Sequence, residues 1–234
     1  MEKENSRQPR AIILPGDVLG DTKGMNAGNN TYVCNGKICS AVLGIKNMNH
    51  DAVSVIPIKG KYMPSTGDTV IGYIDDIGSS NWMVDINSPY PAPLHVNEVP
   101  WKVEFGDTSK YLKIGDTVVL KVLSVDESRK IQVTMKDAGL RKIEGGRLVV
   151  VQPNKISRIV GKSGSMIQIL KNMSDCRVLV GNNGRIWIDG DDENMDVVVE
   201  AIKIIEAETA RGSLTDRIRA FMAERLPEIS SEES

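Results

Sequence analysis

The chain has 234 residues, of which 41% are hydrophobic, and its formal net charge is −2 at pH 7. This length suits one large domain or two to three small ones, with enough apolar residues for real cores. No apolar run approaches the ~18 residues of a membrane span, and residues 1–10 are mixed in charge without an apolar signal core. We therefore expect a disordered lead on a soluble, cytoplasmic protein that does not enter a membrane.

The cysteines and histidines are few and offer little for catalysis. An odd cysteine count, Cys34, Cys39 and Cys176, argues against a secreted disulfide scaffold. No second Cys or His pair completes a zinc site with the first two. His50 and His95 have no catalytic neighbours in the sequence and are interpreted as surface or strand residues. The sequence thus predicts no metal, no cofactor and no enzyme active site.

The first expected domain, residues 11–63, is small and all-β. Two strands flank Asn35-Gly36, which is a strong signal for a type I′ hairpin turn. Residues 53–58 form another strand, which Pro57 places at a sheet edge. A unit of about 50 residues is marginal alone, so we expect it to lean on its neighbour.

The second expected domain, residues 64–137, contains five short strands. In one of them Trp82, Val84 and Ile86 alternate with Met83 and Asp85, which predicts one buried face. A long excursion follows the third strand, and this order fits an OB-type barrel. The strands are expected near residues 69–75, 82–86, 94–96, 117–125 and 131–135.

Barrels of this type bind single strands by combining aromatic platforms with basic grooves. Trp82 lies on the apolar face, so core packing is favoured over base stacking for this residue. Tyr90 lies between prolines in a loop and is the better exposed candidate. For each cation, a solvated side chain remains the alternative. The candidate RNA-binding residues of the barrel are Tyr73, Tyr90, Lys110, Lys113, Arg129 and Lys136.

A short linker, residues 138–144, leads to a stretch organised around Gly161-Lys162-Ser163-Gly164. Two glycines let a backbone approach closely and leave N–H groups near the N-terminus of the following helix, which Ser163 or Ser165 can cap. Such a site suits a phosphodiester, and KH modules clamp short single strands in this way. A P-loop would need glycine where Ile156 stands, so we reject a nucleotide cradle.

The flanking pattern favours a complete type I KH domain over a plain helix–helix turn. Residues 145–212 read in the order β-α-GxxG-α-β-β-α, with a hairpin turn at 181–184 and a long helix over 194–210. Residues 145–174 contain no acidic residue, which creates a local positive field. The candidate RNA-binding residues here are Gly161, Lys162, Ser163, Gly164, Lys155 and Arg158. We expect aspartate at both glycines to weaken RNA binding without unfolding the domain.

The last expected segment is residues 213–234. Gly212-Ser213 ends the long helix, and residues 214–226 can form one more helix. An acidic, Ser-rich tail follows and is expected to be disordered.

The ordered set of these motifs strongly resembles the archaeal exosome cap subunit of the S1/KH type, over about residues 11–212. It comprises a β-rich unit with Pro15-Gly16-Asp17, an S1 barrel entered through residues 62–72, and the KH loop at 161–164. Bacterial phosphorolytic exonucleases carry KH and S1 in the reverse order. The sister cap subunit carries a zinc ribbon, which the cysteines here cannot build.

The resemblance implies a non-catalytic role in RNA degradation or 3′ processing. Members of that family sit as three copies on a hexameric ring of RNase PH-like subunits, collect single-stranded RNA and feed its 3′ end inward. Whether the KH loop binds RNA or serves assembly is left open. The near-balanced charge predicts weak individual patches, which several copies would reinforce. The alternative is a free-standing S1/KH RNA-binding protein acting in translation or as an RNA chaperone.

Overall fold

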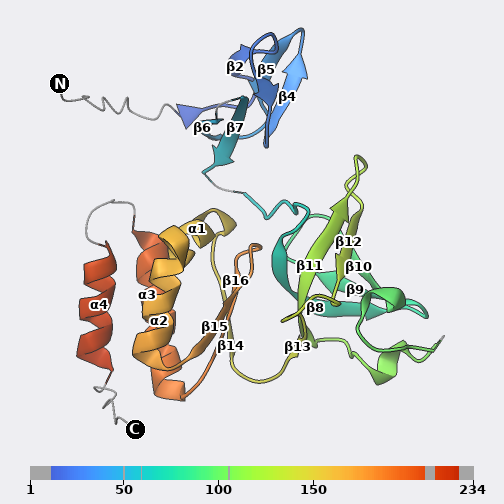
Figure 1. Ribbon diagram of the computed structural model, residues 1–234, viewed down its shortest axis with the longest axis vertical. Coiled ribbons are helices and arrows are strands. Elements are labelled where there is room, and N and C mark those ends of the chain that lie inside the picture. The colour runs from blue at the N-terminus through green and yellow to red at the C-terminus, as the bar shows by residue number, and fades with distance from the viewer. Residues whose placement is uncertain (1–11, 50, 59, 105, 209–213, 227–234) are drawn as a thin grey trace. The chain divides into compact units, whose positions relative to one another are not determined.

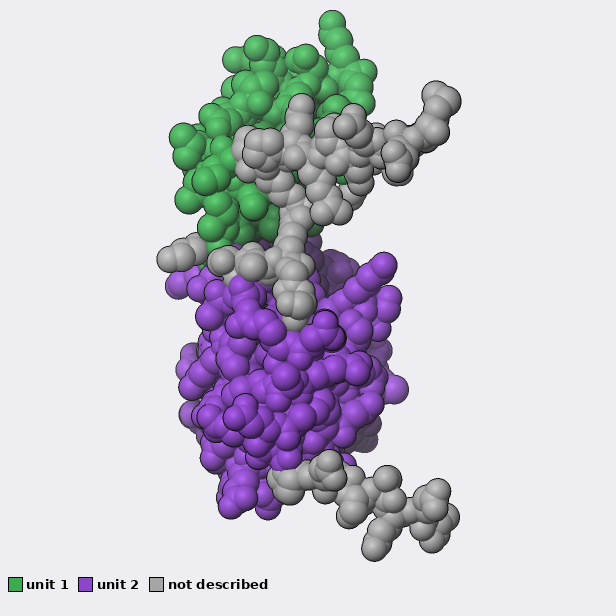
Figure 2. All heavy atoms as spheres, turned by 90° about the vertical axis from the view of Figure 1, so that its left-hand side faces the viewer, with its two compact units in different colours: residues 1–60 green, residues 61–234 purple. Residues whose placement is uncertain are grey.

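The structure is a computed structural model, and it describes residues 12–49, 51–58, 60–104, 106–208 and 214–226. The chain divides into two compact units, Met1–Gly60 and Lys61–Ser234, which Figure 2 colours separately. The expected disordered lead and acidic tail lie outside the described residues. Within the described ranges, no helix is long and apolar enough to cross a membrane.

Unit 1, residues 1–60, consists of two small β-sheets (Figure 1). One has the strand order β1-β6-β7-β3, and the other has the order β2-β5-β4. Leu19 and Ile38 from the second sheet pack with Val53 and Val55 from the first, which confirms a small β unit with its own core. The strands are β1 Ile12–Ile13, β2 Val18–Asp21, β3 Asn26–Ala27, β4 Thr31–Cys34, β5 Lys37–Ser40, β6 Gly44–Asn49 and β7 Ala52–Pro57.

Two sequence predictions in unit 1 have opposite outcomes. Asn35 and Gly36 have φ angles of 50° and 74°, as a type I′ turn requires, and join the antiparallel strands β4 and β5. The prediction that β7 is an edge strand is wrong, because it lies between β6 and β3. Pro57 is tolerated since it is the last residue of β7, whereas β3 pairs only with Ala52 and Val53.

Unit 2, residues 61–234, begins with a closed five-stranded barrel. Neighbouring strands are antiparallel, except where β10 pairs in parallel with β12 at Leu94 and Val133 and closes the ring. The strands are β8 Thr69–Ile77, β9 Asn81–Asp85, β10 Ala92–His95, β11 Thr117–Val125 and β12 Ile131–Thr134. The short strand β13, Lys142–Ile143, extends this sheet beside β11. The expected OB-type barrel is confirmed.

The alternating apolar face of β9 forms part of the barrel core, as predicted. Trp82, Val84 and Ile86 are all buried. The indole N–H of Trp82 donates to the carbonyl oxygen of Thr108 at 3.2 Å, so this tryptophan is a core residue. Thr108 opens the 3₁₀ helix Thr108–Lys110 in the long excursion, and the Trp82 bond fixes the excursion to the barrel.

The KH domain is a three-stranded antiparallel sheet, in the order β14-β16-β15, with its helices packed against one face (Figure 1). The element order β-α-α-β-β-α confirms the type I KH arrangement. The elements are β14 Arg147–Val150, α1 Ile156–Val160, α2 Ser165–Ser174, β15 Arg177–Val180, β16 Arg185–Asp189 and α3 Asp192–Ala207. One-turn 3₁₀ helices at Pro153–Lys155 and Lys162–Gly164 precede α1 and α2.

The C-terminal helices follow the expected order with different bounds. α3 starts earlier than expected because Asp191 caps it by accepting a hydrogen bond from the backbone N–H of Glu193 at 3.2 Å. It ends at Ala207, and the predicted stop at Gly212-Ser213 lies outside the described residues. The expected last helix is α4, Leu214–Arg225, which buries Ile218 and Met222 against the other KH helices.

The other face of the KH sheet packs on the barrel. Trp187 of β16 is buried in one cluster with Ile71 of β8, Val119 of β11 and Ile143 of β13. Its indole N–H donates to the carbonyl oxygen of Gly145 at 2.9 Å. The barrel and the KH domain therefore share an apolar interface, which holds the two modules together.

The β15–β16 hairpin turn strengthens that interface with polar contacts. The backbone N–H of Asn182 donates to the carbonyl oxygen of Thr69 at 2.8 Å. The fully buried side chain of Asn183 accepts a hydrogen bond from the N–H of Ile71 and donates to the carbonyl oxygens of Ile71 and Ile86. Arg185 forms an ion pair with Asp85 on β9. The sequence predicted this turn only as the connection between two strands. In the structure it also docks the KH domain on the barrel.

Candidate nucleic-acid interface

The loop Gly161–Gly164 connects α1 to α2, and three of its four residues have a positive φ angle. Gly161 has φ 77° and ψ 174°, Ser163 has φ 52°, and Gly164 has φ 79°. A Cβ atom on Gly161 would lie 2.7 Å from the backbone nitrogen of Met166, so only glycine fits there. The loop lifts the side chains of Lys162 and Ser163 into solvent.

The loop presents backbone rather than a side-chain cap at the start of α2. The N-cap residue is Gly164 in the left-handed conformation, and no side chain caps the helix there. The prediction that Ser163 or Ser165 caps α2 is therefore wrong. Serine at 163 takes a left-handed φ, and Ser165 is already the first helical residue. Leaving that first turn uncapped by a side chain suits an anion ligand, because helix N-termini attract negative charge.

A groove of about 380 Å³ lies beside this loop. Its residues come from α1, the loop and the docked hairpin turn, so the barrel contacts described above hold one of its walls in place. The lining residues are Pro153, Ile156, Ser157, Val160, Gly161 and Asn182. An apolar wall next to a glycine loop suits the bases and the backbone of a short single strand.

The two cations predicted beside the KH loop lie in different environments. Lys155 is half-buried at the end of the 3₁₀ helix that precedes α1. Arg158 is also half-buried, and its guanidinium donates to the carbonyl oxygen of Glu208, just after α3. Arg158 thus ties α1 to the end of α3, whereas Lys162 at the loop tip is exposed.

The aromatic candidates of the barrel are less accessible than the sequence suggests. Tyr73 is half-buried, and the guanidinium carbon of Arg185 lies 4.7 Å from the centre of its ring. One ring face is therefore covered by the KH domain. Tyr90 is half-buried against the barrel core, although its position between prolines predicted exposure.

The basic candidates of the barrel are exposed and dispersed. Lys110 forms an ion pair with Asp107 at 2.7 Å, and its hydrogen bond with that carboxylate raises the pKa of Lys110. Lys113 and Lys136 lie at opposite ends of the stretch that contains β11 and β12. Arg129 lies in the turn between those strands with φ 62°. The structure does not gather these residues into one cluster with the aromatic candidates.

A second groove, of about 520 Å³, lies on the barrel and was missed from the sequence. The second and third barrel strands of OB folds carry their ligand face, and here those strands are β9 and β10. His95 at the end of β10 accepts a hydrogen bond through Nδ1 from the N–H of Asn97 at 3.1 Å. The lining residues are Asn81, Pro93, His95, Asn97, Glu98, Leu123, Gln132 and Val133. The alternation in β9 could have indicated only Asn81, because the other lining residues come from β10, the turn after it, β11 and β12.

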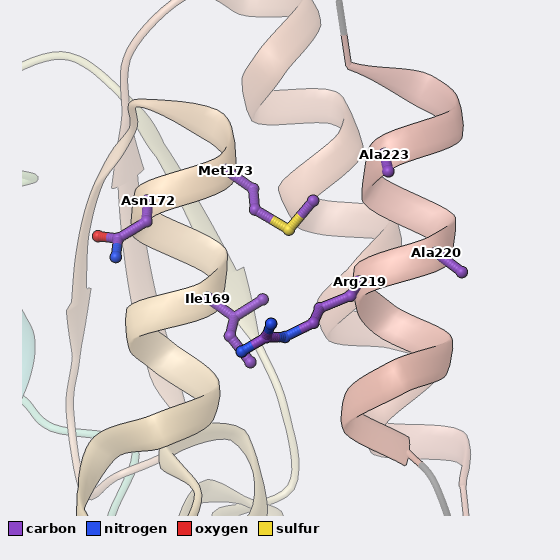
Figure 3. Close-up of a pocket in the computed structure, with 6 residues that line it drawn as sticks. All are labelled: Ile169, Asn172, Met173, Arg219, Ala220 and Ala223. Carbon is purple, nitrogen blue, oxygen red and sulfur yellow. The ribbon is translucent and has the colours of Figure 1, made fainter. Parts of the chain in front are cut away.

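A third groove, of about 460 Å³, lies between α2 and α4 (Figure 3). Figure 3 shows Arg219 extending from α4 toward Ile169 on α2. The lining residues are Ile169, Asn172, Met173, Arg219, Ala220 and Ala223. Only one lining residue is cationic, and the groove lacks a glycine loop, so nothing in its chemistry favours RNA.

Comparisons with known proteins agree with this architecture. Three family models match the chain: the Exosome complex exonuclease RRP4 N-terminal region at residues 12–49, the RRP4 S1 domain at 61–105 and a KH domain at 146–194. The chain is 44% identical over 223 residues to the exosome complex component Rrp4 of Methanosarcina mazei, covering 95% of this chain and 85% of that relative. The corresponding protein of Picrophilus torridus is 38% identical over 213 residues, covering 91% and 92%.

A solved structure extends the comparison to three dimensions. It is a crystal structure described as an exosome complex RNA-binding protein, which aligns with a TM-score of 0.65 and 37% identity over 71% of this chain and 97% of that one. A barrel of the S1 type joined to a type I KH domain defines the S1/KH class of protein. Within that class, the chain belongs to the Rrp4 family of exosome components.

Proposed function

We propose that this protein is a non-catalytic, RNA-binding cap subunit of an archaeal exosome in the cytoplasm. Three copies would sit on a hexameric ring of RNase PH-like subunits, capture single-stranded RNA and guide its 3′ end into the ring for degradation or processing. Membership of the Rrp4 family supports the assignment to an exosome. The arrangement of two grooves on the S1–KH unit supports the assignment to RNA.

The observation that carries the proposal is the KH loop beside its groove. Gly161 leaves room for a polyanion backbone to approach, and Lys162 provides a solvated positive charge at the tip. The groove next to it accepts unstacked bases, while the second groove on the barrel lies on the usual ligand face of OB folds. Two weak sites on one unit increase the effective concentration of bound RNA.

Unit 1 supports the part of the proposal that concerns the ring. Eight of the thirteen large apolar side chains that are exposed among the described residues lie on unit 1, and exposed apolar patches often mark protein-binding surfaces. They are Ile12, Leu14, Val18, Tyr32, Val33, Leu43, Met48 and Ile56. The ring subunits are the partners that we propose for this surface.

The KH loop is best tested at its two exposed residues. Aspartate at both glycines would test the loop poorly, because a Cβ at Gly161 would meet the backbone of Met166 and strain the fold. Lys162→Asp, alone and with Ser163→Asp, should instead weaken binding of a short single-stranded RNA by about tenfold or more at low salt and reduce the salt slope. Lys203→Asp, at an exposed lysine of α3, is the matched control and should bind like the wild type. Equal affinity of all variants would show that the loop is not an RNA contact.

The ring contact is tested separately by mixing the protein with the ring subunits of the same cell. The wild type should co-elute with the ring and increase its rate of RNA degradation. Val33→Glu, on the exposed apolar surface of unit 1, should lose co-elution while keeping its RNA affinity. Ile114→Glu, at an exposed apolar residue of unit 2, is the control. Failure of the wild type to co-elute, combined with tight, salt-sensitive RNA binding by the isolated chain, would favour the free-standing RNA-binding protein instead.

A further inference from the structure

The long excursion between β10 and β11 carries a stacked aromatic pair that the grooves described above do not include. The rings of Trp101 and Tyr111 lie nearly parallel, with an angle of 12° between their planes and 6.0 Å between their centres. The half-buried Trp101 packs against the barrel core, while Tyr111 is 39% exposed. The stack therefore runs from the core of the barrel to its surface.

The orientation of the outer ring is fixed in advance. The hydroxyl of Tyr111 donates to the carbonyl oxygen of Lys102 at 2.9 Å, and its backbone N–H donates to the carbonyl oxygen of Thr108 at 3.2 Å. Thr108 is itself buried and bonded to Trp82 of the core. A ring held by both its hydroxyl and its backbone loses little conformational freedom when a flat ligand stacks on it.

The surroundings of the pair are suited to a polyanion that carries flat groups. Lys102 and Lys113 are exposed, and neither forms an ion pair with a described residue. Lys110 is exposed as well, although Asp107 pairs with it, and Glu104 adds an opposing charge nearby in the sequence. Base–aromatic stacking accompanied by dispersed cations is the usual chemistry of single-strand binding that does not depend on sequence.

The barrel groove lacks this chemistry, because its lining residues are amides, aliphatic side chains, one proline, one glutamate and His95. We propose that Trp101 and Tyr111 form a separate stacking platform for an unpaired base of single-stranded RNA, in addition to the two grooves. The platform rests on the proposed RNA-binding function and extends it: the excursion contributes base stacking, while the KH loop contributes backbone contacts.

The test compares binding of two RNAs of equal length to the full chain, one an oligo(A) strand and the other the same strand without bases. Tyr111→Ala should weaken oligo(A) binding about fivefold to tenfold, which is the low end of the range expected for the loss of one stacked base. The affinity for the strand without bases and the slope of affinity against salt concentration should stay unchanged. Tyr111→Phe keeps the ring and should bind within about twofold of wild type. Met63→Ala, at an apolar residue of unit 2 that is also 39% exposed, is the matched control and should not change either affinity.

Each outcome separates the platform from the broader proposal. Oligo(A) binding by Tyr111→Ala equal to that of the wild type, or an equal loss for both RNAs, would overturn the platform alone. Failure of the wild type to bind either RNA would overturn the RNA-binding function and the platform together. Circular dichroism confirms folding, and where Tyr111→Ala melts below the assay temperature, Tyr111→Leu supplies the comparison, because it retains apolar bulk and removes the flat ring.

Discussion

The contact between the KH domain and the barrel makes a sharp prediction at Asn183. Its side chain is fully buried and makes three hydrogen bonds, at 3.3 Å with the N–H of Ile71, at 2.7 Å with the carbonyl oxygen of Ile71 and at 2.9 Å with that of Ile86. The ladder between β8 and β9 starts only at Tyr73 and Asp85. The carboxamide therefore bonds to the two chains beyond the point where their own pairing stops.

Replacing Asn183 with alanine removes all three bonds and takes these partners from the N–H of Ile71 and the carbonyl oxygen of Ile86 in a buried place, whereas the carbonyl oxygen of Ile71 keeps a bond from Arg185 at 3.2 Å. At about 0.5–1.5 kcal/mol for each bond, the loss in free energy of unfolding should be about 3 kcal/mol. That is a large part of the ~5–15 kcal/mol that stabilises a typical domain. For a unit of this size it corresponds to a fall in Tm of about 6–12 °C.

Intrinsic tryptophan fluorescence suits this measurement, because Trp82, Trp101 and Trp187 all belong to unit 2. Urea unfolding followed by fluorescence should show the loss for Asn183→Ala. Asn182→Ala is the neighbouring control. It removes one exposed side-chain bond, to Asp68 at 2.8 Å, and should cost less than about 1 kcal/mol. A loss below about 1 kcal/mol at Asn183, or equal losses at both positions, would refute the docking role of the turn.

Two further predictions concern buried titratable groups. Burial, together with a hydrogen bond to Asp68, raises the pKa of Tyr62 in the folded protein. The stability that this tyrosine contributes is therefore fully present below its pKa in the unfolded chain, about 10, and is lost as the pH rises above that pKa. Tyr62→Phe should therefore be less stable than the wild type at pH 8, with a difference that shrinks as urea unfolding is repeated up to pH 11; a constant difference would contradict this. Burial also raises the pKa of the Cys176 thiol, and Cys39 is buried, whereas Cys34 is exposed. One thiol should react quickly with Ellman's reagent at pH 8 in the native protein, and Cys34→Ser should remove that phase; fast reaction of two or three thiols would be inconsistent with the structure.

The sequence predicts those parts of the fold that depend on local patterns. Alternation identified Trp82, Val84 and Ile86 as one buried face, and Asn35-Gly36 identified a hairpin turn because both residues tolerate positive φ. The order of helices, strands and glycine loop was enough to indicate a KH domain. In each case the residues that set the structure lie within a few positions of one another.

The remaining features depend on contacts between distant residues, which leave no local pattern. The turn at 181–184 consists of residues that tolerate positive φ, and only Gly184 adopts one, at 83°. Its asparagines instead bond to a barrel more than 90 residues away in the chain. The sequence suggests that Tyr73 is an accessible aromatic residue. In the structure, Arg185, which is distant in the chain, covers one face of its ring. Likewise, Pro57 led to the prediction of an edge strand because the sequence gives no sign that the short strand β3 pairs with the other side of β7.

Under the proposed function, the docked turn would also limit how the KH groove can accept RNA. Asn182 lines that groove and at the same time bonds to Thr69 and Asp68 of the barrel. A ligand that widened the groove would have to break those bonds, so the groove should keep its width on binding and select strands that already fit. Preorganisation of this kind lowers the free-energy cost of binding, and a fixed barrel removes linker freedom between the two sites. With a net charge of −2, the chain has little general attraction to phosphates, so the proposed RNA binding would depend on fixed geometry that adds weak contacts together.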